Sequence, residues 1–454
     1  MTKQLRVGAA KVDISPNQEG MLPIPQAFSG GQYEAVREGE ELHARAIVID
    51  NGETLFLFES FELGNVPRAD ELRKQIEEKY GIRQENMILN GTHNHSAPHL
   101  AGADHKASTA QVASVDTPEV IRWTEHVMDG AVKVVGEALQ NLRPAKYGYG
   151  EGKCYQNVNR DELFDDGYWM QGVNWEGCSD KTLAVVKFVD ENDQLIAAIA
   201  NYAIHSVMSF CAIDADGKMK VTCDFPGICT SYVERQYPGS VVLWQPGAAG
   251  NQNPVFTGFI QYFDDNQTMY HGQLPNGTTY QLGVATGQKI AQDVIRVLKG
   301  ITTYKDHVVI KGVKSELYFP TQKFPEGIDR AWHRKMVDNM HVIPNVKQEK
   351  KLAETTLSGE WAPALAQVVT FGDIAYFSLG AELYNEIGMM CKKASPYAHT
   401  LIVTYTGTPW VGYLLDNAST GKKVFQSYGM IKEGQNDQIV VGGMLDLFDK
   451  VMNS

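Results

Sequence analysis

A short apolar run that leads into a histidine-rich segment is the sequence feature that most restricts what this chain can form. Met87–Leu89 has the composition of a buried strand, and His93, His95 and His99 follow it. In an extended segment residues two apart point to the same side, so His93 and His95 are predicted to project side by side. Two such imidazoles can share one metal ion, or one can bind it while the other transfers protons. A chance surface pair is the alternative interpretation.

Three later apolar runs also lead to a polar side chain that can bind a metal ion. His205 and Glu382 each follow such a run, and Tyr413 lies a little beyond the last one. Two neutral imidazoles and one carboxylate suit a zinc ion that keeps a position open for water. Each residue also has a structural interpretation: His205 as a core histidine bonded to a carbonyl, Glu382 as an acid in a first helical turn, and Tyr413 as a packing residue.

Strand-like and helix-like segments alternate along the chain and predict a mixed α/β fold. Asn51-Gly52 between two apolar runs is a strong hairpin signal, and Thr117-Pro118 has the residues of a helix N-terminus. Helices are predicted over 67–80, 117–139, 224–237, 280–299, 329–340, from Glu382 to about 393, and over 443–452. We see no internal repeat, low-complexity tract or linker, so residues 1–454 are predicted to form a single large domain of mixed β-sheets flanked by helices.

The acidic balance of the chain limits its partners. With 41 basic and 54 acidic residues its net charge is −13, which argues against general binding to nucleic acid or to an anionic membrane surface. No apolar run approaches the roughly 20 residues of a membrane-spanning helix, so no stable membrane insertion is predicted. The start lacks a signal-peptide pattern and the six cysteines are scattered, which predicts reduced thiols and a cytoplasmic protein.

Several segments resemble, in the same order, motifs of the neutral/alkaline (non-lysosomal) ceramidases. Thr92–Pro98 resembles the family's His-X-His-Ser-Gly-Pro motif, and Gly407–Tyr413 resembles its glycine-rich tyrosine loop. The further similar segments are Val7–Pro16, Asn157–Arg160, Ala203–Ser206, Asp224 with Gly227, and Gly380–Glu382. The resemblance spans nearly the whole chain and implies the fold of the ceramidase catalytic domain.

This resemblance implies a Zn2+ site and amide hydrolysis of a small-molecule or lipid-like N-acyl substrate. By similarity the zinc ligands are His93, His205, Glu382 and Tyr413. His95 would act beside the metal on the reacting amide, and Arg160 matches the family's substrate-contacting arginine. Zinc in such a site polarises the carbonyl and lowers the pKa of its water toward about 7.

The sequence departs from the family at three places. Asn251 and Asn253 stand where the family's Gly-Asp-Val-Ser-Pro has Asp and Ser. An amide cannot replace a hydroxyl as a nucleophile or proton carrier, so any role of that serine is lost or reassigned. Phe425 takes the spacing of a further active-site tyrosine, with Tyr428 nearby. The C-terminal immunoglobulin-like domain of many relatives is expected to be missing.

Three hypotheses follow, in descending order. The first is a zinc-dependent amidohydrolase of ceramidase type whose N-acyl substrate need not be ceramide. The second, motivated by Asn251 and Asn253, is a metal hydrolase repurposed for a polar small-molecule amide, lactam or ester. The third is a non-catalytic metal-binding protein. The sequence leaves acyl length, oligomeric state and the native metal open.

Overall fold

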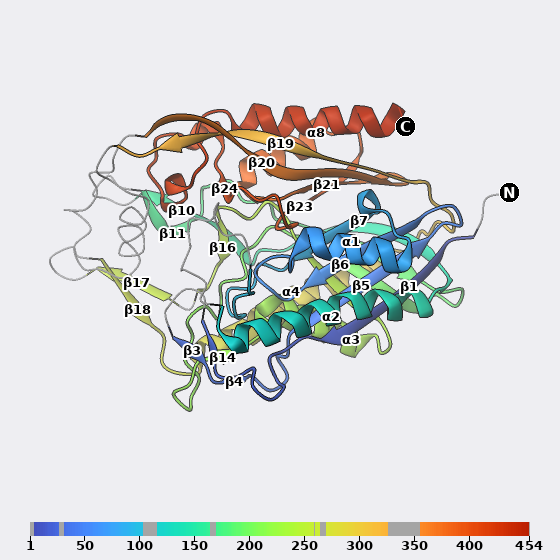
Figure 1. The fold of residues 1–454 in the computed structure, drawn as a ribbon, viewed down its shortest axis with the longest axis horizontal. Coiled ribbons are helices and arrows are strands. Elements are labelled where there is room, and N and C mark those ends of the chain that lie inside the picture. The colour runs from blue at the N-terminus through green and yellow to red at the C-terminus, as the bar shows by residue number, and fades with distance from the viewer. Residues whose placement is uncertain are drawn as a thin grey trace.

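The structure, a computed structural model, describes residues 4–26, 31–102, 116–163, 169–257, 259–263, 269–325 and 355–453. Figure 1 shows a mixed α/β fold in which helices lie outside several β-sheets. This confirms the predicted fold class. The helix predicted over 329–340 lies outside the described residues. No helix in the described ranges is long and apolar enough to cross a lipid bilayer.

The three largest sheets are built from the same succession of elements, which we call a unit. Antiparallel pairing joins the first three strands of each unit. A helix then crosses to a fourth strand that lies parallel to the third, and a second helix follows. Parallel neighbours require such a crossover, which places the helices on the outer face of each sheet. The sequence shows no repeat, so the repetition is one of topology alone.

The units follow one another along the chain. The first unit consists of β1 (Arg6–Asp13), β5 (His43–Asp50), β6 (Leu55–Phe61), α1 (Ala69–Tyr80), β7 (Met87–Gly91) and α2 (Pro118–Gln140), with β8 (Arg143–Pro144) at its edge. The second unit consists of β9 (Lys146–Lys153), β12 (Thr182–Val189), β13 (Leu195–Tyr202), α3 (Asp224–Gln236), β15 (Val241–Pro246) and α4 (Thr278–Gly300). The third unit consists of β19 (Ile310–Lys323), β20 (Thr356–Phe371), β21 (Ile374–Leu379), α7 (Asn385–Ala394), β23 (His399–Val403) and α8 (Asn436–Asn453).

Shorter strands lie in the connections within the units and extend the end of the molecule drawn at the left of Figure 1. They are β2 (Ile24–Pro25), β3 (Gln32–Tyr33), β4 (Ala35–Val36), β10 (Asn157–Leu163), β11 (Trp169–Asn174), β14 (Lys220–Val221), β16 (Gln252–Pro254), β17 (Phe259–Phe263), β18 (Met269–Gln273), β22 (Glu382–Leu383) and β24 (Tyr413–Leu414). β10 pairs with both β11 and β16, and β22 pairs with β24.

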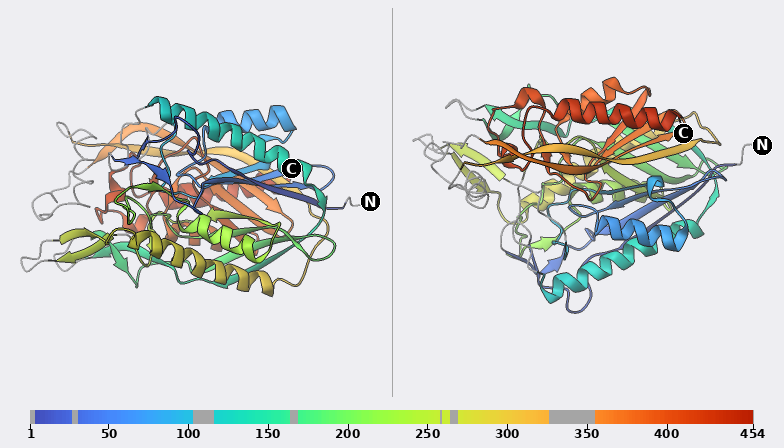
Figure 2. Two further views of the ribbon diagram at one scale, coloured as in Figure 1. Left: turned by 90° about the horizontal axis from the view of Figure 1, so that it is seen from below. Right: turned by 45° about the horizontal axis from the view of Figure 1, so that its top comes forward.

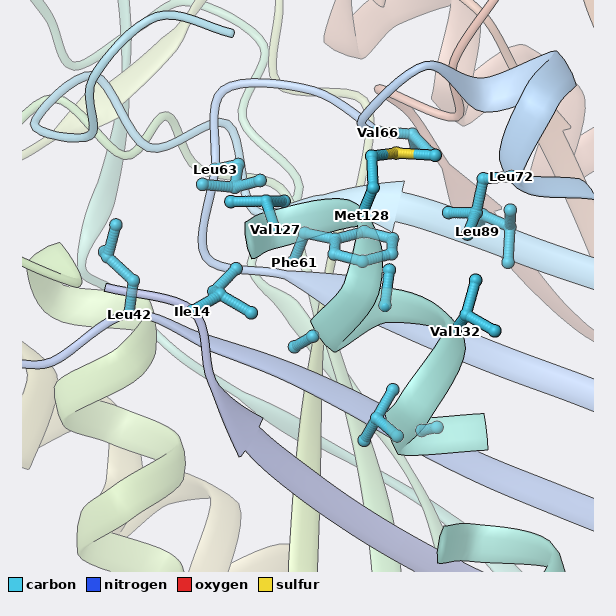
Figure 3. Packing of buried hydrophobic residues seen from close by; sticks show 14 of the residues in the cluster. Ile14, Leu42, Phe61, Leu63, Val66, Leu72, Leu89, Val127, Met128 and Val132 are labelled. Atoms are coloured by element: carbon cyan, nitrogen blue, oxygen red, sulfur yellow. The ribbon is translucent and has the colours of Figure 1, made fainter. Parts of the chain in front are cut away.

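The inner faces of the three sheets share one buried apolar cluster. Phe58 of the first unit, Leu243 of the second and Tyr376 of the third all belong to it. Successive side chains of a strand point to opposite faces of the sheet. Leu57 and Phe61 therefore point away from this cluster and pack beneath the helices on the outer face. Figure 3 shows this outer packing, and Figure 2 shows α2 and α4 on opposite sides of the molecule. Because both faces are covered, the inner strands β6 and β13 are buried along nearly their whole length, which explains their continuous apolar runs, whereas the edge strands β9 and β19 are partly exposed.

Local signals in the sequence predicted local structure correctly. Asn51-Gly52 lies in the β5–β6 hairpin, and the Thr117 hydroxyl accepts a hydrogen bond from the Val120 N–H at the start of α2. The helix predicted to follow Gly380-Ala381-Glu382 is present as α7, but it begins later than the sequence indicates. Glu382 lies in β22, and α7 begins at Asn385. Pairing with a distant strand, which no local pattern reveals, decides the structure at Glu382.

Candidate metal centre

Side chains from all three units meet just beyond the ends of their strands. His93 follows β7 of the first unit, His205 follows β13 of the second, and Glu382 follows β21 of the third. The Nε2 atoms of His93 and His205 are 3.0 Å apart. Glu382 Oε2 lies 3.2 Å from the Nε2 of His205 and 3.3 Å from that of His93. All three residues are at least nine-tenths buried, so the structure brings them together in a dry site.

Backbone carbonyls orient both imidazoles. His93 donates from Nδ1 to the Gly64 carbonyl over 3.2 Å, and His205 donates from Nδ1 to the Ala249 carbonyl over 2.6 Å. A neutral ring that donates from Nδ1 carries its lone pair on Nε2. Both lone pairs therefore point to the same place as the carboxylate oxygen of Glu382. Three acceptors that face one another repel, and a shared cation removes that repulsion.

The spacing of the three atoms fits a zinc ion. Tetrahedral ligands about 2.0–2.1 Å from zinc lie about 3.3 Å from each other. The observed separations of 3.0, 3.2 and 3.3 Å form a triangle of that size. Among the described residues, His93, His95 and His205 also form a cluster in which the ligand atoms lie within 4.8 Å of one another. The site therefore offers four donor atoms, and which of them bind the metal stays a prediction.

His95 lies beside His93, although not for the reason the sequence suggested. The two Nε2 atoms are 2.9 Å apart. The segment is not extended, because it lies beyond β7 and His93 has a left-handed φ of 62°. Asn94 fixes the turn: its amide donates to the carbonyls of Glu62 and Thr222, and its oxygen accepts the Ser96 N–H.

Electrostatics favour neutral imidazoles and an ionised carboxylate. Burial, and then the charge of His93, lower the pKa of His95 well below its ordinary value. Burial, and then the Arg160 charge, lower the pKa of His205 to about 3. Burial alone raises the pKa of Glu382, but the two histidines His93 and His205 outweigh it and hold that pKa well below its ordinary value. Neutral imidazole and carboxylate are the forms that bind a metal ion.

Tyr413 reaches the site through the short parallel pair of β22 and β24. Glu382 and Tyr413 are partners in that pair. The Tyr413 ring is nearly parallel to that of His205, at a centroid distance of 6.5 Å. Its hydroxyl accepts a hydrogen bond from Arg160 Nη2 over 3.1 Å. The predicted fourth ligand therefore lies beside His205 and Glu382.

The buried guanidinium of Arg160 is held by the segment that departs from the family. It donates from Nη1 to Asn253 Oδ1 over 3.2 Å and from Nη2 to the Gly250 carbonyl. Asn251 points elsewhere: its amide donates to Glu386 Oε2 over 2.7 Å, and its oxygen accepts the Asn385 N–H at the start of α7. Asn253 thus orients Arg160. Asn251, directly before β16, instead forms hydrogen bonds that join this segment to the start of α7.

Three further residues that the sequence analysis named are not part of the site as described. One is described and lies elsewhere, and the side chains of the other two are not described. Asp224, which belongs to one of the segments that resemble the family, is the first residue of α3. Its carboxylate accepts the N–H groups of Ser209 and Phe225, and burial raises its pKa to about 6. The side chains of Phe425 and Tyr428 lie outside the described part of the structure.

Sequence reasoning missed Tyr405. Its ring stacks on the imidazole of His93 with a centroid distance of 3.8 Å and an interplanar angle of 14°. The available signal was its position directly after the last apolar run, which is shared by the other residues of the site.

A family model described as neutral/alkaline non-lysosomal ceramidase, N-terminal, matches residues 32–262. A segment of 214 residues, 44% of this chain, is 29% identical to the neutral ceramidase of Pseudomonas aeruginosa and covers 30% of that protein. Another of 181 residues, 39% of this chain, is 24% identical to neutral ceramidase B of Dictyostelium discoideum and covers 22% of it. These matches span less than a third of either relative.

The fold is also similar to solved structures. The crystal structure of neutral ceramidase from Pseudomonas aeruginosa matches with a TM-score of 0.69 and 15% identity, over 98% of this chain and 75% of that one. A ceramidase complexed with C2 matches with a TM-score of 0.69 and 16% identity, over 99% of this chain and 76% of that one. Since the family model covers just over half of the sequence, the chain belongs to the neutral/alkaline non-lysosomal ceramidase family.

Proposed function

We propose that this protein is a zinc-dependent amidohydrolase of ceramidase type that cleaves an N-acyl compound. The observation that carries the proposal is the triangle of acceptor atoms from His93, His205 and Glu382, with sides of 3.0 to 3.3 Å. Membership of the ceramidase family supports the amide bond as the target. A zinc ion bound here would polarise the amide carbonyl and lower the pKa of a water toward about 7.

The chain's own residues supply the remaining chemistry. A neutral His95 can accept a proton at Nε2, which lies 2.9 Å from the His93 Nε2, and return it to the leaving amine. Arg160 fixes the Tyr413 phenol beside Glu382 and adds positive charge where a carbonyl oxygen becomes negative. Burial of all these groups except part of His95 excludes water and strengthens each interaction.

A second candidate substrate class is favoured by one contact. Asn253 Oδ1 accepts a hydrogen bond from Arg160, the residue expected to contact the substrate. With an amide in place of a hydroxyl at this point, the polar group that positions Arg160 differs from that of the family. A polar small-molecule amide, lactam or ester is therefore the alternative to a long-chain N-acyl lipid.

The test combines metal analysis with a substrate panel. The purified protein is assayed for bound metals by mass spectrometry, and then for hydrolysis of long-chain N-acylsphingosines and short polar amides, lactams and esters. We expect about one zinc per chain, amide hydrolysis that chelation abolishes, and its recovery when zinc is added back. Activity on short polar compounds alone would select the second candidate. A protein without bound metal that hydrolyses none of the panel would contradict both.

A further inference from the structure

Tyr405 occupies in the third unit the place that His93 occupies in the first. Each is the second residue after the fourth strand of its unit, since β7 ends at Gly91 and β23 ends at Val403. Both have a left-handed backbone, with φ of 62° for His93 and 59° for Tyr405. Non-glycine residues rarely adopt this region, and those that do cluster at functional sites. The two units therefore make the same unfavourable turn, and each turn presents a ring.

The two rings meet face to face. Tyr405 is fully buried, and its ring lies 3.8 Å from that of His93 at an angle of 14°. Its edge also approaches His205, with centroids 6.1 Å apart and an angle of 82°. The Tyr405 carbonyl accepts the N–H of Gly91 over 3.0 Å, so the backbones are joined as well. One side chain thus contacts both imidazoles of the candidate metal centre.

Other parts of its own loop hold Tyr405 in place. Trp410 packs against it with ring centroids 5.7 Å apart. Gly407 brings the same loop against α1, where a Cβ atom would come within 2.5 Å of the Ala69 Cβ. The Tyr405 hydroxyl has no hydrogen-bond partner among the described residues. Its contacts therefore come from the ring, which has few ways to move.

His93 needs this support more than His205 does. The Nδ1 atom of His205 is held by a hydrogen bond of 2.6 Å, whereas that of His93 lies 3.2 Å from its carbonyl. A single long hydrogen bond leaves an imidazole free to tilt about that bond, whereas a stacked ring fixes its plane. The plane decides whether Nε2 points at Glu382 and His205.

We propose that Tyr405 is a positioning residue for the metal centre: its ring holds the His93 imidazole in the plane that aims Nε2 at the shared cation. This inference rests on the proposed zinc site and adds a residue to it. The contribution comes from the aromatic face, so phenylalanine can replace tyrosine and an aliphatic side chain cannot.

The experiment measures zinc affinity directly. Wild type, Tyr405→Phe, Tyr405→Leu and Tyr405→Met are titrated with zinc against a competing chelator, and thermal unfolding reports the folded state of each. Methionine is included because its flexible chain fills irregular space, which favours a folded variant. We expect about 10- to 100-fold weaker zinc binding for the leucine and methionine variants, the usual cost of losing an outer partner of a metal ligand. The phenylalanine variant should bind zinc like the wild type.

A second readout separates positioning from general stability. Cobalt(II) in place of zinc has visible absorption bands that depend on ligand geometry, and these should change in the leucine and methionine variants and stay unchanged in the phenylalanine variant. A folded leucine or methionine variant with the affinity and spectrum of the wild type would overturn the inference. A phenylalanine variant with weakened affinity would also overturn it, even if both aliphatic variants fail to fold. Wild-type protein that binds no zinc would instead remove the proposed function.

Discussion

The first and third units have the same topology but contribute differently to the site. Past its fourth strand the first unit places His93, which can bind a metal, whereas the third places Tyr405, which packs against it. Past the third strand the roles are reversed: the first unit places the Gly64 carbonyl, which orients His93, while the third places Glu382, which can itself bind the metal. The difference shows that the same strand topology brings several loop positions to the candidate metal centre. A position that carries no metal-binding side chain instead orients a neighbouring side chain that can bind the metal.

The largest effect is expected in the second unit, which extends the comparison because its His205 has the same position after the third strand as Glu382. His205 and Glu382 are each the third residue after the third strand of their units, so they face the same point from different sheets. We expect His205→Ala to weaken zinc binding by more than the roughly 100-fold that an outer partner costs, and to abolish zinc-dependent hydrolysis. His307→Ala, whose side chain is 64% exposed, is the matched control. A His205→Ala protein with wild-type zinc content would break the comparison.

A smaller effect is expected where the second and third units touch. Gly250 follows the fourth strand of the second unit, and a Cβ there would come within 2.7 Å of the Glu382 carbonyl oxygen and 2.9 Å of the Leu383 oxygen. Both are backbone atoms, so β22 must shift. We expect Gly250→Ala to lower the unfolding free energy by about 1–3 kcal/mol, the usual cost of overpacking, and to weaken zinc binding because Glu382 moves with its strand.

Gly442→Ala makes the same chemical change in open space on α8, where, apart from the neighbouring backbone of the helix, no atom of the described residues lies within 4 Å of the added Cβ. Alanine in a helix is about 0.5–1 kcal/mol better than glycine, so this control should be neutral or stabilising. Equal losses of stability in the two variants, measured by denaturant unfolding, would contradict the close approach of the two units.

The smallest effect concerns a second buried glutamate. Glu59, in the third strand of the first unit, is fully buried, and neither of its carboxyl oxygens has a hydrogen-bond partner among the described residues. Burial, opposed less strongly by the charge of Arg73, raises its pKa well above the ordinary 4.5, opposite to the direction for Glu382. The two glutamates differ because the histidines accompany only one of them.

The sign of the pH dependence follows from the raised pKa. A group whose pKa is higher in the folded state contributes stability that is complete below its unfolded pKa and is lost as the pH rises through its folded pKa. We therefore expect Glu59→Gln to unfold at a higher temperature than the wild type at alkaline pH, with a difference that shrinks toward pH 4.5, the ordinary value for glutamate. A difference that is constant with pH, or grows toward acid, would show that Glu59 is ionised in the folded protein.

Sequence patterns predicted those parts of the structure that depend on neighbouring residues. The Asn51-Gly52 hairpin and the Thr117 cap are local, and both are present. The approach of His93, His205 and Glu382 was predicted because each follows an apolar run, and the family resemblance indicated which polar residues to group. The β22–β24 pair was missed, since it joins segments with no pattern of their own.

Two features were beyond the reach of sequence patterns. The threefold repetition lies in the order and direction of strands, which different residues achieve in each unit, so no residue repeat records it. The stack of Tyr405 on His93 depends on left-handed turns in two segments from opposite ends of the chain. Asparagine or glycine would signal such a turn, whereas histidine and tyrosine do not.

The distribution of the site over all three units has a consequence during synthesis. A nascent chain that has left the ribosome up to the second unit holds both imidazoles but lacks Glu382, Tyr405 and Tyr413, which arrive with the third. Such an intermediate has neither the anionic donor nor the ring that orients His93. For the proposed zinc site, tight retention of the ion would therefore begin only once translation has passed β24, and a bound ion would mark a polypeptide whose last sheet has docked.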